Sequence, residues 1–254
     1  AQQMTQMRNG SNASIEAVRG LSAQDNAHLV DAIRALDELP SLRAQVDKLS
    51  ISGTESGERY TRLIKTLIGF THSLEANVNN AGVIHALSAL NQFIEMKERA
   101  GRDRVLLGLV FNQGYFDETL LSRFSSNLGE FSAYSDAFRR KAPPASLKQF
   151  EEQMRSPVAL EVDRLQRLAF EIPLGQPLNI KPEMWFQTST QRIDLMGQAW
   201  QEDMRNTADF KAYRPNSGKA LCAPYRIYVV CVPPPPSSGV AVLQLLAMAE
   251  QTPD

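Results

Sequence analysis

Residues 83–110 read VIHALSALNQFIEMKERAGRDRVLLGLV, and their apolar side chains recur about every 3.6 residues, the period of an α-helix. The apolar stripe consists of Val83, Leu87, Leu90, Ile94, Val105, Leu109 and Val110. Glu98, Gly101 and Arg102 occupy the positions that should continue it. Charges on a core-facing stripe destabilise the fold unless they have partners. We therefore expect a binding site at this interruption.

The same helical period extends over most of residues 12–207. The central helix, residues 81–112, would be about 45 Å long at about 1.5 Å per residue. Further helices are expected over residues 15–36, after Pro40, over 54–74 with Thr54 as N-cap, from Asp117, from Pro143-Pro144 to Phe170, and over 183–206. No strand pattern precedes residue 210. Residues 1–207 are thus predicted to form an all-α, extended up-and-down helical bundle.

Composition narrows the class of protein. Hydrophobic residues make up 43% of the 254 residues, too many for a disordered chain. The formal net charge of −1 gives no overall attraction for nucleic acid or an acidic membrane, so we expect no nucleic-acid binding by this segment. No window approaches the roughly 18 consecutive apolar residues of a membrane span, so no transmembrane segment is expected, and no signal peptide is visible.

The sequence offers no metal or catalytic constellation. Its three histidines are scattered, and its two cysteines, Cys222 and Cys231, do not have the spacing of a metal site. Ser237 and Ser238 have no histidine or lysine nearby in sequence that could activate them. We therefore predict no cofactor, no metal and no enzymatic activity.

The last 47 residues differ from the bundle. Residues 225–232, YRIYVVCV, are rich in β-branched and aromatic side chains and predict a strand. Four prolines follow, and residues 240–250 predict a short helix. One strand and one helix cannot bury a core of their own. Residues 208–254 are expected to be a strand-plus-helix appendage and not an independent domain.

Two segments of the bundle resemble motifs of the nitrate- and nitrite-sensing (NIT) domain of bacterial signalling proteins. They are KERAGRDR at residues 97–104, and PLN at 177–179 followed by EMWFQTSTQRID at 183–194. The resemblance spans about residues 15–206. It implies an all-helical domain that binds the anion with arginines from facing helices and reports to an RNA-binding antiterminator, a chemoreceptor or a kinase.

Family members usually begin with a helix that carries a Glu-Arg-Gly-like segment and contributes arginines to the anion site. Here the N-terminus offers Arg8 and Val18-Arg19-Gly20, so we expect the first helix to be incomplete. The resemblance also implies a soluble bacterial domain, either periplasmic or cytoplasmic.

The resemblance and the chemistry of nitrate together select candidate ligand-binding residues. Nitrate is planar and carries one delocalised charge, which forked guanidinium donors suit better than a lysine. The candidates are Arg99, Arg102 and Arg104 on the central helix, with Arg192 and Thr188 on the last helix. We expect guanidinium groups of separate helices to converge on a shared pocket.

Two further expectations concern these helices. The apolar face of the last helix is predicted to consist of Phe186, Thr190, Ile193, Gly197, Trp200 and Met204, with Arg192 at its border. Gly101, Gly108 and Gly197 would let neighbouring helices approach closely. The alternative for Arg102 is an intrahelical ion pair with Glu98, four residues earlier.

The appendage resembles part of the large subunit of gamma-glutamyltransferases. The matching residues are 208–215, ADFKAYRP, 221–226, LCAPYR, and 233–240, PPPPSSGV. The match ends before the place of that family's nucleophilic threonine, so no catalytic role carries over.

We therefore expect a signal-sensing domain that binds nitrate or nitrite between helices and passes a conformational change to an output module. A homodimer formed through the helices is a further expectation. Two alternatives stay open: a structural or dimerising helical module without a ligand, and an inactive gamma-glutamyltransferase-related fragment.

Overall fold

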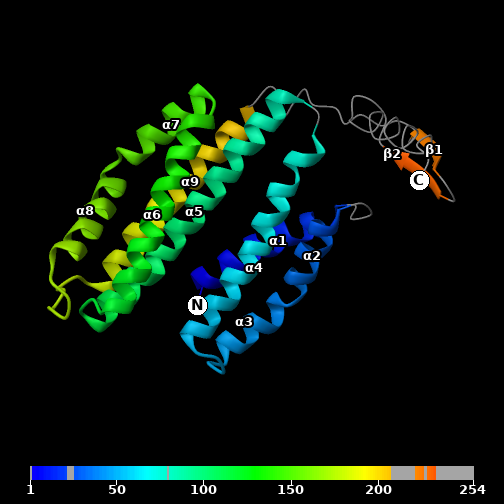
Figure 1. The fold of residues 1–254 in the computed structure, drawn as a ribbon. Helices are drawn as coiled ribbons and strands as arrows, with labels where there is room; N and C mark the ends of the chain where they lie inside the picture. Colours follow the sequence, from blue (N-terminus) through cyan, green and yellow to red (C-terminus); the bar gives the residue numbers. More distant parts are fainter. Residues whose placement is uncertain (1, 22–25, 79, 207–220, 226–227, 233–254) are drawn as a thin grey trace, which may run out of the picture.

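A computed structural model describes residues 2–21, 26–78, 80–206, 221–225 and 228–232 (Figure 1). Within them the chain forms nine α-helices, a short 3-10 turn at Glu75–Asn77 and two strands. The helices are α1 (Gln2–Arg19), α2 (Ala27–Asp37), α3 (Leu39–Asp47), α4 (Gly53–Ser73), α5 (Ala81–Gln113), α6 (Glu118–Lys141), α7 (Pro144–Met154), α8 (Pro157–Glu171) and α9 (Pro182–Asn206). The predicted all-α bundle is confirmed.

The helices form two groups that meet along α5. Helix α5 packs along α6 and α9, while α7 and α8 lie against α9. Helices α1 to α4 form the second group, in which α4 contacts both α2 and α5 (Figure 1). The described residues contain no helix that is long and apolar enough to cross a membrane.

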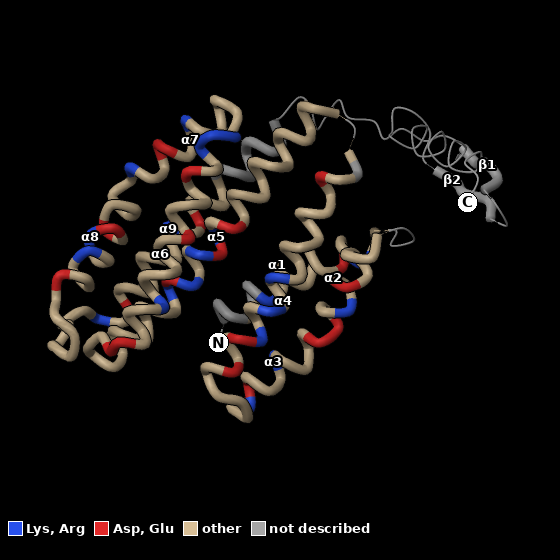
Figure 2. The backbone as a smooth tube through the Cα atoms, viewed as in Figure 1, with Lys and Arg blue, Asp and Glu red and all other residues tan. Residues whose placement is uncertain are grey.

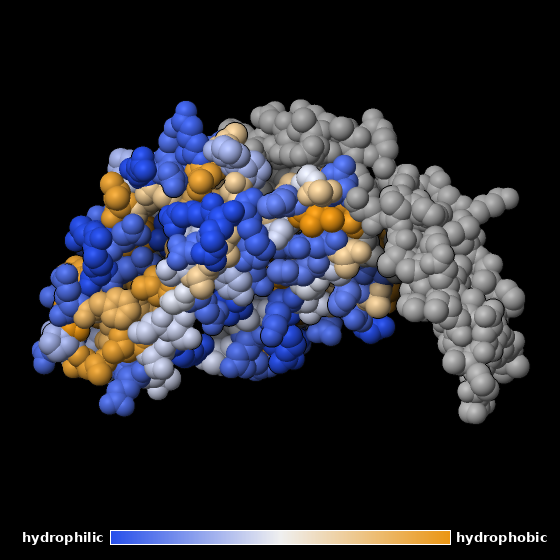
Figure 3. Space-filling model, turned by 45° about the horizontal axis from the view of Figure 1, so that its top comes forward, coloured by the Kyte–Doolittle hydropathy of each residue, from blue (hydrophilic) through white to orange (hydrophobic). Residues whose placement is uncertain are grey.

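Most of the buried side chains belong to the α5–α9 group. One core cluster includes Leu107, Phe124 and Trp185, and a second includes Met96, Phe138 and Met196. The core of α1 to α4 is smaller and consists mainly of leucines on α2 and α3. On the face that Figure 3 shows, hydrophobic surface occurs in separate patches between hydrophilic ones.

The predicted apolar stripe of α5 was correct at Val83, Leu87 and Val110 but wrong at Val105 and Leu109. Val105 and Leu109 are 56% and 48% exposed, whereas Met96 and Leu107 are fully buried. Apolar residues occur on nearly every side of this helix, so several stripes fit the same period. The charged residues that face the core are Arg99 and Asp103, while Glu98, Gly101 and Arg102 are only half-buried.

Two expected helices are each divided in the structure. Residues 15–36 contain the end of α1 and all but the last residue of α2, because the Asn26 side chain accepts a hydrogen bond from the Leu29 N–H and starts a new helix. Ser156 caps α8 in the same way and separates it from α7. Helix α4 is capped by Ser52 instead of Thr54. The predicted cap at Asp117 is confirmed by a 2.8 Å bond from the Leu120 N–H.

At one end of the α5–α9 group, backbone bonds join two loops. The Leu178 N–H donates to the carbonyl of Gly114 at 2.6 Å, and the Gly175 N–H donates to that of Phe116 at 3.0 Å. Gly114 ends α5 with φ 85°, a conformation that glycine adopts most readily. The α8–α9 loop is thereby attached to the α5–α6 turn.

The appendage contains two strands where one was predicted. Strand β1 (Leu221–Tyr225) pairs antiparallel with β2 (Tyr228–Val232), and Cys222 lies opposite Cys231. The expected strand over 225–232 is therefore correct for residues 228–232, and β1 was missed. The expected helix over 240–250 lies outside the described residues.

Candidate functional site

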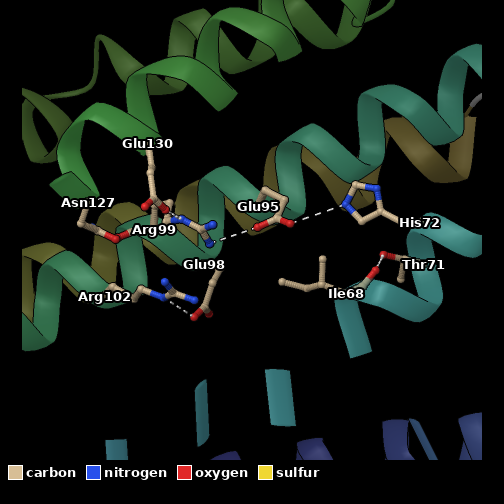
Figure 4. Close-up of polar contacts among 9 residues, drawn as sticks. All are labelled: Ile68, Thr71, His72, Glu95, Glu98, Arg99, Arg102, Asn127 and Glu130. Carbon is tan, nitrogen blue, oxygen red and sulfur yellow. Dashed lines mark hydrogen bonds and ion pairs between the residues drawn. The ribbon is translucent and has the colours of Figure 1, made fainter. Parts of the chain in front are cut away.

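The three candidate arginines of α5 point in different directions. Successive residues of an α-helix are separated by about 100° around its axis, so residues 99, 102 and 104 cannot share one face. Arg99 extends toward α6, whereas Arg102 extends with Glu98 to the side of α5 on which Ile68 of α4 lies (Figure 4). Arg104 contacts α9.

Arg99 is already neutralised by carboxylates. It is 8% exposed, and its guanidinium contacts Glu95 at 3.0 Å and also Glu130 of α6. Its guanidinium carbon lies 5.0 Å from the centre of the Tyr134 ring. Glu95 also lies 3.6 Å from His72 of α4. These residues form a chain of polar contacts from α4 through α5 to α6 (Figure 4).

Arg102 forms the intrahelical ion pair that was the alternative to a binding role. Its Nε donates to Glu98 Oε1 at 2.9 Å, and its side chain is 31% exposed. Among the contacts of the described residues, its Nη1 and Nη2 have no partner. One edge of this guanidinium is therefore occupied by a carboxylate, and the other is open on the side of α4.

Arg104 packs against the first turns of α9. Its Nη1 donates to the Thr190 hydroxyl at 2.9 Å, and its guanidinium carbon lies 5.1 Å from the Phe186 ring centre. Its Nε is buried without a hydrogen-bond partner, and burial lowers the pKa of this guanidinium. In addition, its backbone carbonyl accepts a bond from Trp185 Nε1 at 2.9 Å. Arg104 thus fixes α9 on α5.

Arg192 lies inside the α5–α9 group. It is 3% exposed, and its guanidinium is 3.9 Å from Asp103 and 3.6 Å from Asp163. Its Nε and Nη2 are buried without hydrogen-bond partners. Burial lowers the pKa of this guanidinium, and the two carboxylates oppose that shift. The Arg192 cation is therefore stabilised more by electrostatic attraction to the Asp103 and Asp163 carboxylates than by direct hydrogen bonds.

Asp103 is the carboxylate at the centre of this interior network. It is fully buried and accepts hydrogen bonds from Asn127 of α6 at 2.7 Å and from Gln166 of α8 at 2.9 Å. Burial raises the pKa of Asp103 to about 6, and these two hydrogen bonds and Arg192 oppose the shift. Sequence reasoning missed this network. The one available indication was that Asp103 lies within the KERAGRDR motif.

In the described part of the chain, Thr188 forms no hydrogen bond with the candidate arginines, and the buried face of α9 differs from the predicted one. The Thr188 hydroxyl donates to the carbonyl of Met184 in its own helix at 2.8 Å. The predicted apolar face was correct at Ile193, which packs against the core, but wrong at Phe186, which is 54% exposed while its neighbour Trp185 is fully buried. Among the described side chains of α9, Trp185, Ser189, Arg192 and Met196 are buried. The predicted Trp200 and Met204 lie outside the described side chains. Arg192 is therefore central to this face and not at its border.

The five candidates do not form a shared pocket. Arg99, Arg102 and Arg192 are each paired with different carboxylates. Arg99 and Asp103, the partner of Arg192, lie one turn apart on the buried side of α5, whereas Arg102 lies with Glu98 on another side (Figure 4). The expectation for two of the glycines was also wrong. A Cβ atom at Gly101 or Gly108 would meet nothing within 4 Å, whereas at Gly197 it would lie 2.9 Å from Lys97 Nζ.

The arginines of α1 are paired at the surface. Arg8 forms two 2.8 Å bonds with Asp47, and Arg19 contacts Glu16 at 3.0 Å and Asp37 at 2.6 Å. Both arginines therefore connect α1 to the neighbouring helices of its own group.

Comparison with known proteins is consistent with this fold. The family model described as "Nitrate and nitrite sensing" matches residues 1–206, and the model "Gamma-glutamyltranspeptidase" matches residues 199–254. The nitrate regulatory protein of Klebsiella oxytoca is 27% identical over 168 residues, which are 65% of this chain and 41% of that protein.

A solved structure has the same fold. The structure of the NasR transcription antiterminator is 26% identical and superposes with a TM-score of 0.66, covering 74% of this chain and 53% of the NasR chain. The present chain therefore spans about half the length, or less, of both relatives.

Proposed function

Because this chain belongs to the nitrate- and nitrite-sensing family, we propose that it binds nitrate or nitrite on the side of α5 that faces α4 and passes the change to an output module. A regulatory role in nitrate or nitrite sensing is supported by the names of both relatives, a nitrate regulatory protein and a transcription antiterminator. Neither name describes an enzyme. Beyond this regulatory role, we propose where the anion binds and that its binding is coupled to an output module.

The open edge of Arg102 carries the proposal. Its Nε holds the planar carboxylate of Glu98, and Nη1 and Nη2 offer a second fork of donors that suits another planar anion. Arg99 and Arg192 are less suitable, because each already has two carboxylates near its guanidinium. A further anion beside them would be repelled.

The other candidates then have supporting roles. Arg99 fixes Glu95 and Glu130 on either side of it, and Glu95 in turn contacts His72 of α4. Arg104 and Arg192 hold α9 against α5, and Thr188 lies on α9 outside these contacts. An anion on Arg102 would thus change the charge balance close to the junction between the two helix groups.

Ligand-biased repacking would transmit the signal. An anion changes a conformational equilibrium only by as much as it binds one arrangement better than the other. An anion bound to Arg102, on the side of α5 that faces α4, would favour the arrangement in which α4 lies closest to the Arg102 guanidinium. Movement of α4 relative to α5 would then be the change passed to the output module.

A thermal melt in the presence of anions tests the site. Nitrate and nitrite, but not chloride, should raise the unfolding midpoint, since a ligand that binds only the folded state adds about 2.7 kcal/mol at one hundred times its dissociation constant. Arg102→Ala should abolish the shift, and Arg102→Lys should weaken it because a lysine lacks the fork. Calorimetric titration of the same proteins would give the affinities.

Arg155→Ala is the matched control. Arg155 also pairs with a glutamate four residues earlier, Glu151 at 3.6 Å, but it lies at the C-terminal end of α7. This variant should keep the full nitrate response. A response that survives in Arg102→Ala would place the anion elsewhere, and no response in the unmodified protein would favour a structural or dimerising module.

The remaining predictions concern partners and the appendage. Analytical sedimentation would test whether two copies pair through their helices. Titration with RNA would test the prediction that this segment does not bind nucleic acid. A chromogenic gamma-glutamyl substrate should show no turnover. Turnover that disappears when Ser237 and Ser238 are mutated would contradict the view of residues 208–254 as an inactive fragment.

A further inference from the structure

A hollow of about 310 Å³ lies between α2 and α4, within the α1–α4 group and apart from the α5 arginines. Arg34 of α2 and Arg59 and Arg62 of α4 contribute to its lining. Figure 2 marks basic positions on both of these helices. Pockets for small organic ligands begin at about this volume.

The residues that line the hollow include one more cation than anion. Arg34 contacts Asp31 at 3.3 Å, and Arg59 donates to Gln45 at 2.6 Å and lies 4.0 Å from Glu55, which is outside the lining. The guanidinium of Arg62 has no hydrogen bond or ion pair among the contacts of the described residues, and its backbone carbonyl accepts from the Thr66 hydroxyl at 3.2 Å. Asp31 and Glu38 also line the hollow, so three guanidinium groups face two carboxylates. A ligand with a single negative charge would pair with the Arg62 guanidinium, since Arg34 and Arg59 each already have a carboxylate nearby.

The hollow also has an apolar floor. Leu42 is 2% exposed, and Ala35 and Leu63, which line the same space, are half-buried. A nitrate ion is too small to cover these side chains and fill the space. A ligand with a hydrocarbon part would displace water from them, and its burial would add hydrophobic stabilisation.

We propose that this hollow is a second binding site, which takes a small organic carboxylate with an apolar body. The carboxylate would lie against the guanidinium of Arg62, with Arg34 and Arg59 nearby, and the apolar body would lie on Leu42, Ala35 and Leu63. The site does not depend on the anion site proposed at Arg102. It would give the α1–α4 group a ligand of its own.

Ligand-observed NMR titration of the full chain with three probes tests this proposal. Benzoate carries both the charge and the ring, acetate only the charge, and benzyl alcohol only the ring. Benzoate should bind with a dissociation constant of about a millimolar, as expected for a ligand of this size. Acetate and benzyl alcohol should each bind at least about tenfold more weakly, because each lacks one half of the recognition.

Two variants separate the halves of the site. Arg62→Ala should weaken benzoate about tenfold and leave benzyl alcohol unchanged, since it removes only a charged hydrogen-bond donor. Ala35→Leu should weaken both benzoate and benzyl alcohol, because it fills the hollow without changing its charge. Arg62 is exposed, so its replacement should leave the circular dichroism spectrum unchanged.

Arg43→Ala is the control. Arg43 lies in the same helix group and donates to Asn12 at 2.6 Å, but it does not line the hollow, so this variant should bind benzoate normally. Benzoate binding no tighter than that of acetate, or binding that is the same in Arg62→Ala and Ala35→Leu as in the unmodified chain, would overturn the proposal. The nitrate response of Arg62→Ala is expected to be unchanged, so the two sites can fail separately.

Discussion

Asp103 and Arg192 are opposite charges in the interior of the α5–α9 group, yet 3.9 Å separates their nearest charged atoms. Asp103 instead takes its hydrogen bonds from the neutral side chains of Asn127 and Gln166. This arrangement gives the carboxylate oxygens hydrogen-bond donors but leaves the negative charge without a close cation, which is consistent with a pKa of about 6. The protonation of one residue is thereby linked to the packing of four helices.

This linkage predicts how Asp103→Asn changes the response of stability to pH. The folded pKa of about 6 exceeds the unfolded value of about 3.9, so the folded state binds the proton more tightly. The stabilising contribution of Asp103 is therefore full below about pH 4 and is lost as the pH rises through about 6. Relative to the unmodified chain, the variant should gain about 2 kcal/mol in unfolding free energy between about pH 4 and pH 7.

Urea unfolding of both proteins over this range would measure the difference. The comparison between them cancels the contributions of the other carboxylates. A difference that stays constant with pH would mean that Asp103 titrates in the folded protein as it does in the unfolded chain.

Arg192→Met tests the other half of the pair. Removing this cation leaves the Asp103 charge buried without an opposite charge nearby, which should lower the unfolding free energy by about 3 kcal/mol near pH 7.5. The loss should be smaller near pH 4.5, where Asp103 is protonated. Arg155→Met, which removes an exposed pair on α7, should change stability by less than about 1 kcal/mol at either pH. Equal losses from Arg192→Met at both values would argue against the coupling.

The sequence could predict which residues belong to the candidate site but not which residues they contact. The KERAGRDR and EMWFQTSTQRID motifs, together with the chemistry of arginine, selected Arg99, Arg102, Arg104 and Arg192, and all four occupy buried or half-buried positions. What they contact could not be predicted, because the partners Glu130 and Asp163 come from helices with no motif to identify them. Spacing along one helix also cannot show which neighbouring helix each side chain meets.

At the scale of the helix, the glycines of α5 predict opposite effects of the same substitution. Gly101→Ala and Gly108→Ala should each stabilise the protein by about 0.5 to 1 kcal/mol, since both lie inside a helix with open space around the added carbon. Gly114→Ala should destabilise it by about 1 kcal/mol, because φ there is 85°. Thermal melts would measure all three, and stabilisation by Gly114→Ala would contradict the role of this residue as the helix end.

The helices were predicted well in type, but two expected helices are each divided in the structure, and phases and ends were predicted less well. Helix α5 was expected within one residue of its observed bounds, because Asn112-Gln113-Gly114 is a clear stop. Its buried face was wrong at Val105 and Leu109, since a helix enclosed on several sides has no single apolar stripe. The divisions at Asn26 and Ser156 depend on single capping side chains, which leave little trace in the periodicity.

At the scale of the whole molecule, the two helix groups should differ in local stability. Helix α5 has buried residues along its whole length, whereas Ile68 is the buried residue of α4 and the described side chains of α1 are exposed or half-buried. Amide hydrogen exchange should therefore be fastest in α1, slower in α4 and slowest in α5 and α6. Exchange in α1 as slow as in α5 would contradict this order.

The same measurement with bound nitrate would test communication between the groups. Slower exchange should appear first in α4 and in α5 around residues 95–102, where His72, Glu95 and Arg102 lie. Arg102→Ala should show no such change, while Arg155→Ala should behave like the unmodified protein. Slower exchange confined to α7 and α8 would contradict an anion site between α5 and α4.

The backbone bonds from Leu178 to Gly114 and from Gly175 to Phe116 make one end of the α5–α9 group a pivot. Helix α9 starts beside this pivot and extends for 25 residues, about 37 Å, before the chain continues beyond Asn206. Like a lever, it converts a tilt of about 5° at the fixed end into a displacement of about 3 Å at the far end. Whatever follows α9 is therefore attached where the smallest rotation of this helix gives the largest movement.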